Sequence, residues 1–213
     1  MDRRSWNRFI PHAGMALALA VAFGGAIVTR AAASDEHIGP WPQERQGWLI
    51  GFGLGGGSAG LTVKSDPQDS LAAESDNNRE GGTTASFRFG YAFNSQIAVE
   101  LESGGWTKAE NAVTVTFTNF GVALSYYPGG GGLMLRGGIG YGGVDFSAQI
   151  SGETLTLRQT GFSPHLAAGY EFRVRRTFAI GPLVTYNYVS TDSFKANWVD
   201  GELAFNWYFI PQH

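Results

Sequence analysis

The sequence predicts an all-β protein, an eight-stranded antiparallel up-and-down transmembrane β-barrel. Three observations support this fold class. Eight segments alternate large apolar residues with small or polar ones, at the period of two that a β-strand requires. The connections alternate between tight turns and longer polar loops, and the last segment, near the C-terminus, has one aromatic face. Membrane barrels combine these features.

Residues 1–33 are typical of an export signal and are left out of the fold. Three arginines lie within the first eight residues, an apolar run of 14 residues follows at 15–28, and a small-residue cleavage motif ends at Ala33. A spanning helix needs about 20 apolar residues, which disfavours a retained anchor. We expect cleavage near Ala33, a periplasmic N-terminal lead at 34–47 and the barrel at 48–210.

Composition narrows the functional classes. Without residues 1–33 the chain has 11 basic and 17 acidic residues, and this negative balance argues against a nucleic-acid partner. The absence of cysteine excludes disulfides and thiolate metal sites. No pattern in the sequence indicates a cofactor or a metal ion.

Four alternating segments form the first half of the predicted barrel. In the first, Trp48, Ile50, Phe52 and Leu54 share one face, and the residues between them are mostly glycine. The next three segments repeat this alternation of large apolar with small or polar side chains. The four strands are predicted at residues 48–63, 83–93, 96–106 and 113–127.

The second half repeats the pattern with two irregularities. Its strands are predicted at residues 132–149, 159–173, 177–190 and 196–209. In the first of them the parity of the apolar residues changes near Gly142 and Gly143, where a glycine bulge is expected. In the last, Trp198 does not share the parity of Leu203. Either a bulge lies near Asp200 or Trp198 points elsewhere.

The connections between these segments are short at one end of the barrel and longer at the other. Tight turns are predicted at 94–95, 128–131 and 174–176, and longer loops at 64–82, 107–112, 150–158 and 191–195. In membrane barrels the short turns are periplasmic, so both termini are expected on the periplasmic side. The even number of strands lets the sheet close without an exposed edge.

Two barrel classes fit this alternation and differ in which face points outward. A soluble lipocalin-like barrel needs its large apolar side chains inside, but an eight-stranded lumen is narrow. Here glycine and alanine crowd one face, and the large apolar side chains of the other would leave an exposed surface that soluble monomers avoid. The membrane barrel is therefore the prediction.

Aromatic residues near the strand ends are expected to form two interfacial rims. The predicted periplasmic rim comprises Trp48, Phe93, Tyr126, Phe172, Phe178, Trp207 and Phe209. The predicted outer rim comprises Trp106, Phe117, Phe162, Tyr186 and Tyr188.

Six charged residues have the parity of the small face and are expected in the lumen. They are Arg88, Glu100, Glu102, Arg136, Glu171 and Glu202. Buried charges are costly unless they are paired. We expect a network that joins Arg88 to Glu100 or Glu102, with Arg136 and Glu171 nearby. It is interpreted either as a salt-bridge plug that fills the lumen or as a gate whose rearrangement opens a narrow path.

Two other kinds of site have less support. Nucleophilic catalysis needs a Ser–His–acid set, and the histidine within a predicted strand, His165, has inward parity and is expected to pack in the lumen. The loop at 64–82 is acidic, but its spacing matches no EF-hand. We expect a solvated loop. Divalent cations shared with lipopolysaccharide, or a host or envelope ligand, stay as alternatives there.

The last strand resembles the C-terminal sorting signal of bacterial outer-membrane barrels, with Glu202, Ala204, Trp207 and Phe209 at the positions of the signal. Four residues follow Phe209, whereas the family's signal usually ends on its aromatic residue. Residues 48–209 as a whole resemble the small eight-stranded outer-membrane protein family, typified by the barrel of outer membrane protein A and its X-type relatives.

This resemblance implies an integral, monomeric barrel in the bacterial outer membrane, in contact with lipid and lipopolysaccharide. It also implies insertion by the barrel assembly machinery with periplasmic chaperones. The expected role is structural, in the envelope, or in surface interaction, without catalysis. A narrow channel for small or hydrophobic solutes is the alternative, and a lipid A-modifying enzyme is less favoured.

Overall fold

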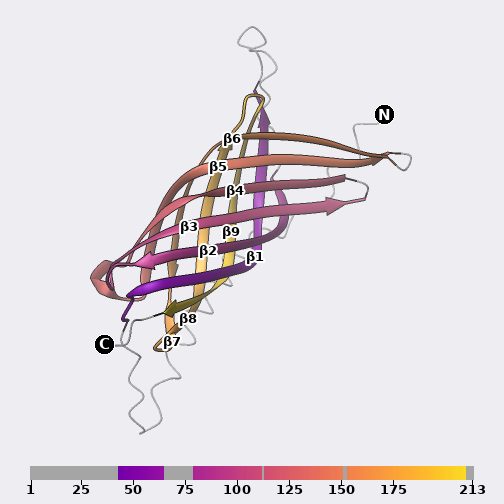
Figure 1. Cartoon of the computed structure of the whole chain (residues 1–213). Helices are drawn as coiled ribbons and strands as arrows, with labels where there is room; N and C mark the ends of the chain where they lie inside the picture. The colour runs from indigo at the N-terminus through magenta and orange to yellow at the C-terminus, as the bar shows by residue number, and fades with distance from the viewer. Residues whose placement is uncertain (1–42, 65–78, 112, 151–152, 210–213) are drawn as a thin grey trace. The chain divides into compact units, whose positions relative to one another are not determined.

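A computed structural model describes residues 43–64, 79–111, 113–150 and 153–209. The predicted export signal lies outside these residues. The strands form one antiparallel sheet that closes on itself (Figure 1). They are β1 (Gly47–Val63), β2 (Glu80–Ala92), β3 (Ile97–Glu110), β4 (Val113–Tyr126), β5 (Leu133–Ile150), β6 (Glu153–Tyr170), β7 (Phe172–Arg175), β8 (Phe178–Ser190) and β9 (Phe194–Phe209). A 3-10 turn, η1 (Pro128–Gly130), joins β4 to β5. In the described ranges no helix has the length and apolar character needed to cross a bilayer.

The order of the strands in the sheet gives the barrel eight strand positions. Neighbours run β6-β5-β4-β3-β2-β1-β9-β8-β7, and β6 also pairs with β8. β7 continues β6 after a break at Glu171, so the two fill one place together. The first and last strands pair in an unbroken register from Trp48 opposite Phe209 to Val63 opposite Phe194. The predicted eight-stranded antiparallel barrel is thereby confirmed.

The faces of the strands follow the alternation of the sequence. Large apolar side chains such as Leu54, Ile139 and Leu166 are exposed on the outside, as a lipid-facing surface requires. Several outward aromatics contact each other across strands near the end with the short turns, here called the turn end. Trp48 stacks on Phe89 with ring centroids 5.1 Å apart.

Two residues of the predicted outer rim lie inside the lumen instead. Trp106 stacks on Phe117 with centroids 5.2 Å apart, and Phe117 stacks on Trp198 at 5.8 Å. All three are buried, together with Val144 and Val189. Their placement in the rim was wrong because strand alternation gives Trp106 and Phe117 inward parity. This end of the lumen is filled by an apolar layer.

Neither irregularity of the second half is a bulge. The pairing of β5 with β4 and β6 runs without a shift through Gly142 and Gly143, so the expected glycine bulge is wrong. The parity change arises because Val144 turns an apolar side chain into the lumen. The register of β9 is likewise continuous, and Trp198 points inward.

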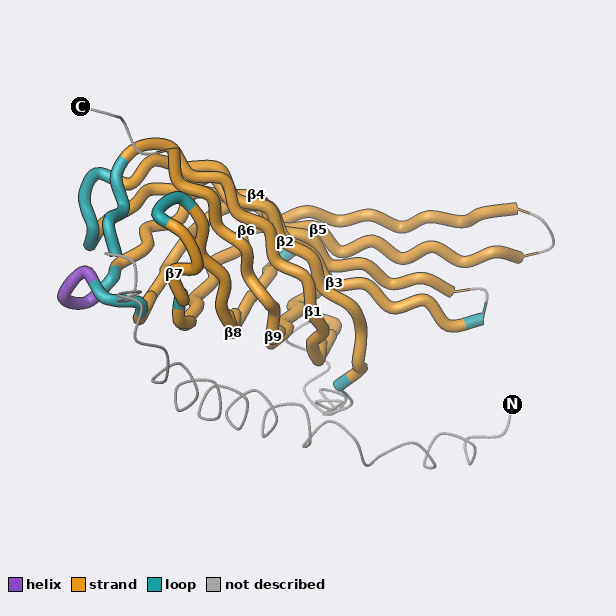
Figure 2. Tube along the Cα trace, turned by 90° about the horizontal axis from the view of Figure 1, so that it is seen from below, coloured by secondary structure: helices purple, strands orange, loops and turns teal. Residues whose placement is uncertain are grey.

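Two segments predicted as loops are strands. β3 and β4 stay paired as far as Glu110 opposite Val113, and β5 and β6 as far as Ile150 opposite Glu153. The predictions of loops at 107–112 and 150–158 were therefore wrong for residues 107–110, 150 and 153–158, which lie in strands. The two hairpins project beyond the other strands (Figure 2). Because β4 also pairs with β5 along this length, they form one four-stranded extension, here called the projecting sheet.

Candidate functional site

Arg136 on β5 is the centre of a charged layer in the middle of the lumen, formed with Glu100, Glu102 and Ser125 and here called the Arg136 layer. Its Nη1 lies 3.2 Å from Glu102 Oε2, and its Nη2 lies 3.4 Å from Glu100 Oε2. Its Nε donates to Ser125 Oγ at 2.9 Å, and that hydroxyl donates to Glu100. All four side chains are buried. One guanidinium thus links two carboxylates of β3 to β4 and β5.

Arg88 lies in the same lumen but has a different partner from the expected one. Its Nη2 donates to Asn206 Oδ1 at 3.0 Å. Among the described residues its guanidinium forms no ion pair within 4.0 Å, so the expected link to Glu100 or Glu102 was wrong. Glu102 lies directly opposite on β3, but its carboxylate is bound by Arg136, which approaches from β5.

His165 packs against this layer. Its side chain is 4% exposed, and its Nε2 lies 3.7 Å from Glu102 Oε2. Gly138 makes room for it, since a Cβ there would stand 2.3 Å from the imidazole ring. Glu202 on β9 is also buried and accepts a hydrogen bond from Ser86 Oγ at 2.6 Å. Gly53 leaves the space for that pair.

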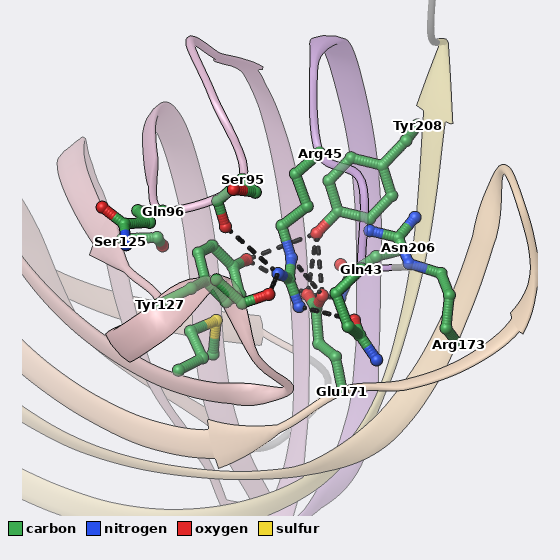
Figure 3. A network of polar contacts seen from close by, with 12 residues as sticks. Gln43, Arg45, Ser95, Gln96, Ser125, Tyr127, Glu171, Arg173, Asn206 and Tyr208 are labelled. Atoms are coloured by element: carbon green, nitrogen blue, oxygen red, sulfur yellow. Dashed lines mark hydrogen bonds and ion pairs between the residues drawn. The ribbon is translucent and has the colours of Figure 1, made fainter. Parts of the chain in front are cut away.

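Glu171 belongs to a second cluster at the turn end, which Asn206 links to Arg88 (Figure 3). Arg45 Nε lies 3.0 Å from Glu171 Oε2. Asn206 Nδ2, Tyr208 OH and Tyr127 OH donate to Glu171 at 2.7, 2.9 and 3.1 Å. Figure 3 shows these side chains converging on the carboxylate. Asn206 and Tyr208 come from β9, and Tyr127 directly follows β4. Arg45 precedes β1, so the N-terminal lead enters the barrel here. We call this cluster the Arg45–Glu171 clasp.

The clasp also ties the lead to the short turns. Arg45 Nη1 donates to the carbonyl oxygens of Ser95 and Gly130 at 3.2 and 3.3 Å. Its guanidinium lies 3.7 Å from the centre of the Tyr127 ring, a cation–π contact. The turns after β2 and β4 and the lead are therefore joined by one side chain.

The charge states in the clasp follow from burial and from Glu171. Burial alone would lower the pKa of the Arg45 guanidinium, but the Glu171 carboxylate and the tyrosine hydroxyls raise it above its ordinary value. Burial, with the same carboxylate, raises the pKa of Tyr127 well above its ordinary value. Arg45 is therefore charged at physiological pH, and Tyr127 donates as a neutral phenol.

The projecting sheet offers a second candidate site, on the edge of β6. From Glu153 to Gly161, β6 pairs with β5, whereas its pairing with β8 begins only at Phe162. Gln159 binds the β8–β9 connection, accepting from Thr191 Oγ1 at 2.9 Å. Within the described ranges no strand covers the edge at 153–158, here called the open edge. Alternate backbone N–H and C=O groups there lack a partner strand.

The open edge borders apolar side chains on the inward-parity face of the projecting sheet. Leu155 is 59% exposed and Leu157 is 51% exposed. Leu157 lies opposite Phe146 on β5, which lies opposite Val115 on β4. Arg158, on the other face, pairs with Asp145 at 3.3 Å. On β4, β5 and β6 one face of the projecting sheet is thus apolar up to the open edge and the other is polar, whereas on β3 the apolar face carries the ion pair of Lys108 with Glu110.

The remaining predicted residues have simpler positions. Ala204 is buried in the lumen like Glu202, whereas Trp207 and Phe209 are exposed on the outside near the turn end. Their action as a sorting signal stays a prediction. Most of the acidic loop at 64–82 lies outside the described residues. In the part of the chain that is described, no group of three or more acidic or histidine side chains is arranged to hold a metal ion.

Sequence reasoning missed Arg45, Tyr127 and Tyr208 as members of the buried network. Arg45 lies outside every alternating segment, so no periodicity marked it as buried. Tyr208 has the inward parity of Glu202 and Ala204, and that parity was the signal that could have found it.

Comparisons with known proteins agree with this architecture. The family model described as outer membrane protein beta-barrel domain matches residues 16–206. The crystal structure of Ail, the attachment invasion locus protein of Yersinia pestis, has a TM-score of 0.52 at 15% identity, over 76% of this chain and 99% of that chain. The structure of Neisserial surface protein A has a TM-score of 0.57 at 13% identity, over 76% and 97%. These likenesses are of fold alone.

A more distant structure, the outer membrane protease OmpT from Escherichia coli, has a TM-score of 0.40 at 9% identity, over 83% of this chain and 100% of that chain. A likeness this low says nothing about catalysis. No curated protein matches the chain.

Proposed function

Because the chain belongs to the outer membrane protein beta-barrel domain family and lies in the bacterial outer membrane, we propose that it acts there in surface interaction. In this proposal the projecting sheet binds an extended segment of a partner protein, which adds as a strand beside β6. The apolar outer face of the barrel contacts membrane lipid and holds the sheet in place.

The open edge at 153–158 is the observation that carries this proposal. Exposed sheet edges are usually shortened, charged or covered, because they pair with other chains. Here the edge belongs to a four-stranded sheet and carries two exposed leucines. An added strand gains main-chain hydrogen bonds along the edge and places alternate side chains beside Leu155 and Leu157. The partner is therefore an extended segment with apolar residues at alternate positions.

The names of the fold relatives point in the same direction without carrying the argument. One is an attachment invasion locus protein and the other a surface protein. We also propose that the lumen of the protein is plugged at rest, since the apolar layer, the Arg136 layer and the Arg45–Glu171 clasp lie one after another along it. A narrow channel has less support for this reason. A lipid A-modifying enzyme has less still, because His165 is buried beside Glu102.

A peptide-binding measurement tests the surface proposal. Fluorescent peptides of about ten residues, the length of a strand, with apolar residues at alternate positions, are titrated against the folded full chain in detergent micelles. We expect the double substitution Leu155→Lys and Leu157→Lys to weaken binding by at least about tenfold, or about 1.4 kcal/mol. Lysine replaces the apolar side chains that the peptide would contact with charged ones.

Thr156→Lys is the matched control, since it adds one positive charge to the same strand on the opposite face. It should change the dissociation constant less than about twofold, because its side chain lies on the polar face and leaves the contacts of the two leucines intact. Equal weakening in both variants would reduce the effect to charge alone, and absence of binding by any alternating peptide would refute the proposal.

A further inference from the structure

A small polar cavity lies in the lumen between the Arg136 layer and the apolar layer. Three carboxylates line it, those of Glu102, Asp200 and Glu202, together with Asn119 and the indole of Trp198. The volume of the cavity, taken as the space open to the centre of a water molecule, is about 10 Å³. A cavity of this size holds about one water-sized particle.

Two of the three carboxylates have no cation beside them. Glu102 is bound by Arg136. Glu202 accepts from the Ser86 hydroxyl, and Asp200 Oδ2 accepts from Asn187 Nδ2 at 3.0 Å, so both have neutral donors. Among the described residues no lysine or arginine nitrogen lies within 4.0 Å of either carboxylate. Buried carboxylates in this situation need a positive charge or a proton.

In the lumen as a whole, the buried acidic residues outnumber the buried arginines by one. The carboxylates are those of Glu100, Glu102, Glu171, Asp200 and Glu202, and the guanidiniums are those of Arg45, Arg88, Arg136 and Arg173. Five acids face four bases. His165 does not line the cavity, and as a neutral imidazole it leaves this difference unchanged. The single charge of Arg136 is shared by Glu100 and Glu102. One monovalent cation would therefore balance the described lumen.

A hydrogen-bond chain aims a further oxygen into the cavity. An ionised Asp200 only accepts, so the amide of Asn187 must turn its Nδ2 toward it and its Oδ1 away. Asn119 then donates its Nδ2 to that Oδ1, at 2.6 Å, which leaves Asn119 Oδ1 without a donor. Asn119 is 6% exposed, and this oxygen lies over Gly104, a residue of the cavity wall.

We propose that this cavity binds one monovalent alkali cation, held by Asp200, Glu202 and Asn119 Oδ1. Oxygen ligands suit hard cations, and a single positive charge is what the five buried acids and four buried arginines leave to be supplied. The cation connects β9 to β4 across the lumen.

The proposal is tested by folding the full chain from denaturant in potassium, sodium or choline chloride at equal ionic strength. The pH is held at about 8, where an ordinary histidine is neutral. Choline is too large for the cavity. At a salt concentration ten times the dissociation constant, we expect the potassium or sodium form to have an unfolding equilibrium constant about tenfold smaller than the choline form.

Asp200→Asn combined with Glu202→Gln should abolish this salt dependence and make the choline form as stable as the others. Asn119→Leu, which keeps both carboxylates and removes the amide oxygen, should weaken it. Asp145→Asn, on the polar face of the projecting sheet, should leave it unchanged. In crystals grown with thallium(I), an anomalous peak is expected between Asp200, Glu202 and Asn119.

Equal stability of the unsubstituted chain in all three salts would overturn the proposal and assign the balancing charge to a proton. Retention of the salt dependence in the double variant would also overturn it. The experiment concerns the lumen only, so its failure leaves the binding role of the open edge standing.

Discussion

The contribution of a charged residue to the stability of this barrel depends on whether its side chain is buried or exposed. Glu171 is buried and has four side-chain donors, including Arg45. Glu44, one residue before Arg45, pairs with Arg176 at 3.7 Å, with both side chains more than half exposed. Exposed pairs contribute about 0–1 kcal/mol, whereas breaking a buried pair costs about 3–5 kcal/mol.

Glu171→Gln should therefore lower the free energy of unfolding by about 3 kcal/mol, because it leaves the Arg45 guanidinium buried without a counter-charge. Glu44→Gln is the control and should change it by less than about 0.5 kcal/mol. Both are measured by urea unfolding in lipid vesicles. Similar losses in the two variants would show that Glu171 contributes no more than a surface charge.

Strand parity alone predicted that six charged side chains face the lumen, and all six are buried. It could not predict their partners. Arg136 reaches Glu100 and Glu102 across β4, and Arg88 reaches Asn206 across β1. The lengths and rotamers of side chains decide these contacts, and they leave no mark on the alternation of the sequence.

At the scale of the element, glycines set how closely neighbouring side chains and strands approach. A Cβ on Gly140 of β5 would stand 2.1 Å from the Phe120 carbonyl oxygen of β4, and that backbone cannot move without breaking the ladder. A Cβ on Gly201 of β9 would meet nothing within 4 Å. The two glycines lie within paired strands of the same barrel but tolerate substitution differently.

Gly140→Ala should destabilise the barrel by about 1–3 kcal/mol through overpacking. Gly201→Ala should stay within about 0.5 kcal/mol of the unsubstituted chain, as substitutions in open positions do. Urea unfolding of both variants checks this. A tolerated Gly140→Ala would mean that β4 and β5 can separate locally, contrary to their unbroken register.

The strands in the membrane were predicted to within a few residues, because one face meets lipid and the alternation there is strong. The part of the projecting sheet that contains Leu155 and Leu157 was predicted as a loop. The two leucines alternate with threonines, as in a strand, but the polar residues of the other face are also typical of a loop. Trp106 and Phe117 were assigned to a rim because their position near strand ends was weighed above their parity.

At the scale of the whole molecule, the barrel is closed by pairing and filled by side chains. The β1–β9 seam has a continuous register, and the lumen holds the Trp106–Phe117–Trp198 stack, the Arg136 layer and the clasp. A plug and a gate differ in whether removing one charged member opens a path.

We expect no ion conductance for the unsubstituted chain in planar lipid bilayers. Arg136→Ala should leave the barrel non-conducting, because the apolar layer and the clasp stay in place and act as independent barriers. Glu171→Gln is recorded beside it as a variant from the other polar layer. Conductance that appears with Arg136→Ala alone would favour the gate and contradict the plug.

The Arg45–Glu171 clasp has a consequence for following the folding of this protein. Its two residues lie 126 positions apart in the chain, and the carboxylate also binds Tyr208 of the last strand, so the clasp completes only after the two ends of the sheet have met. Arg45 is 1% exposed in the closed barrel. A protease that cuts after arginine therefore reaches this peptide bond only in chains that have not yet closed. The time at which the chain becomes resistant to cleavage at Arg45 thus reports the closure of the barrel.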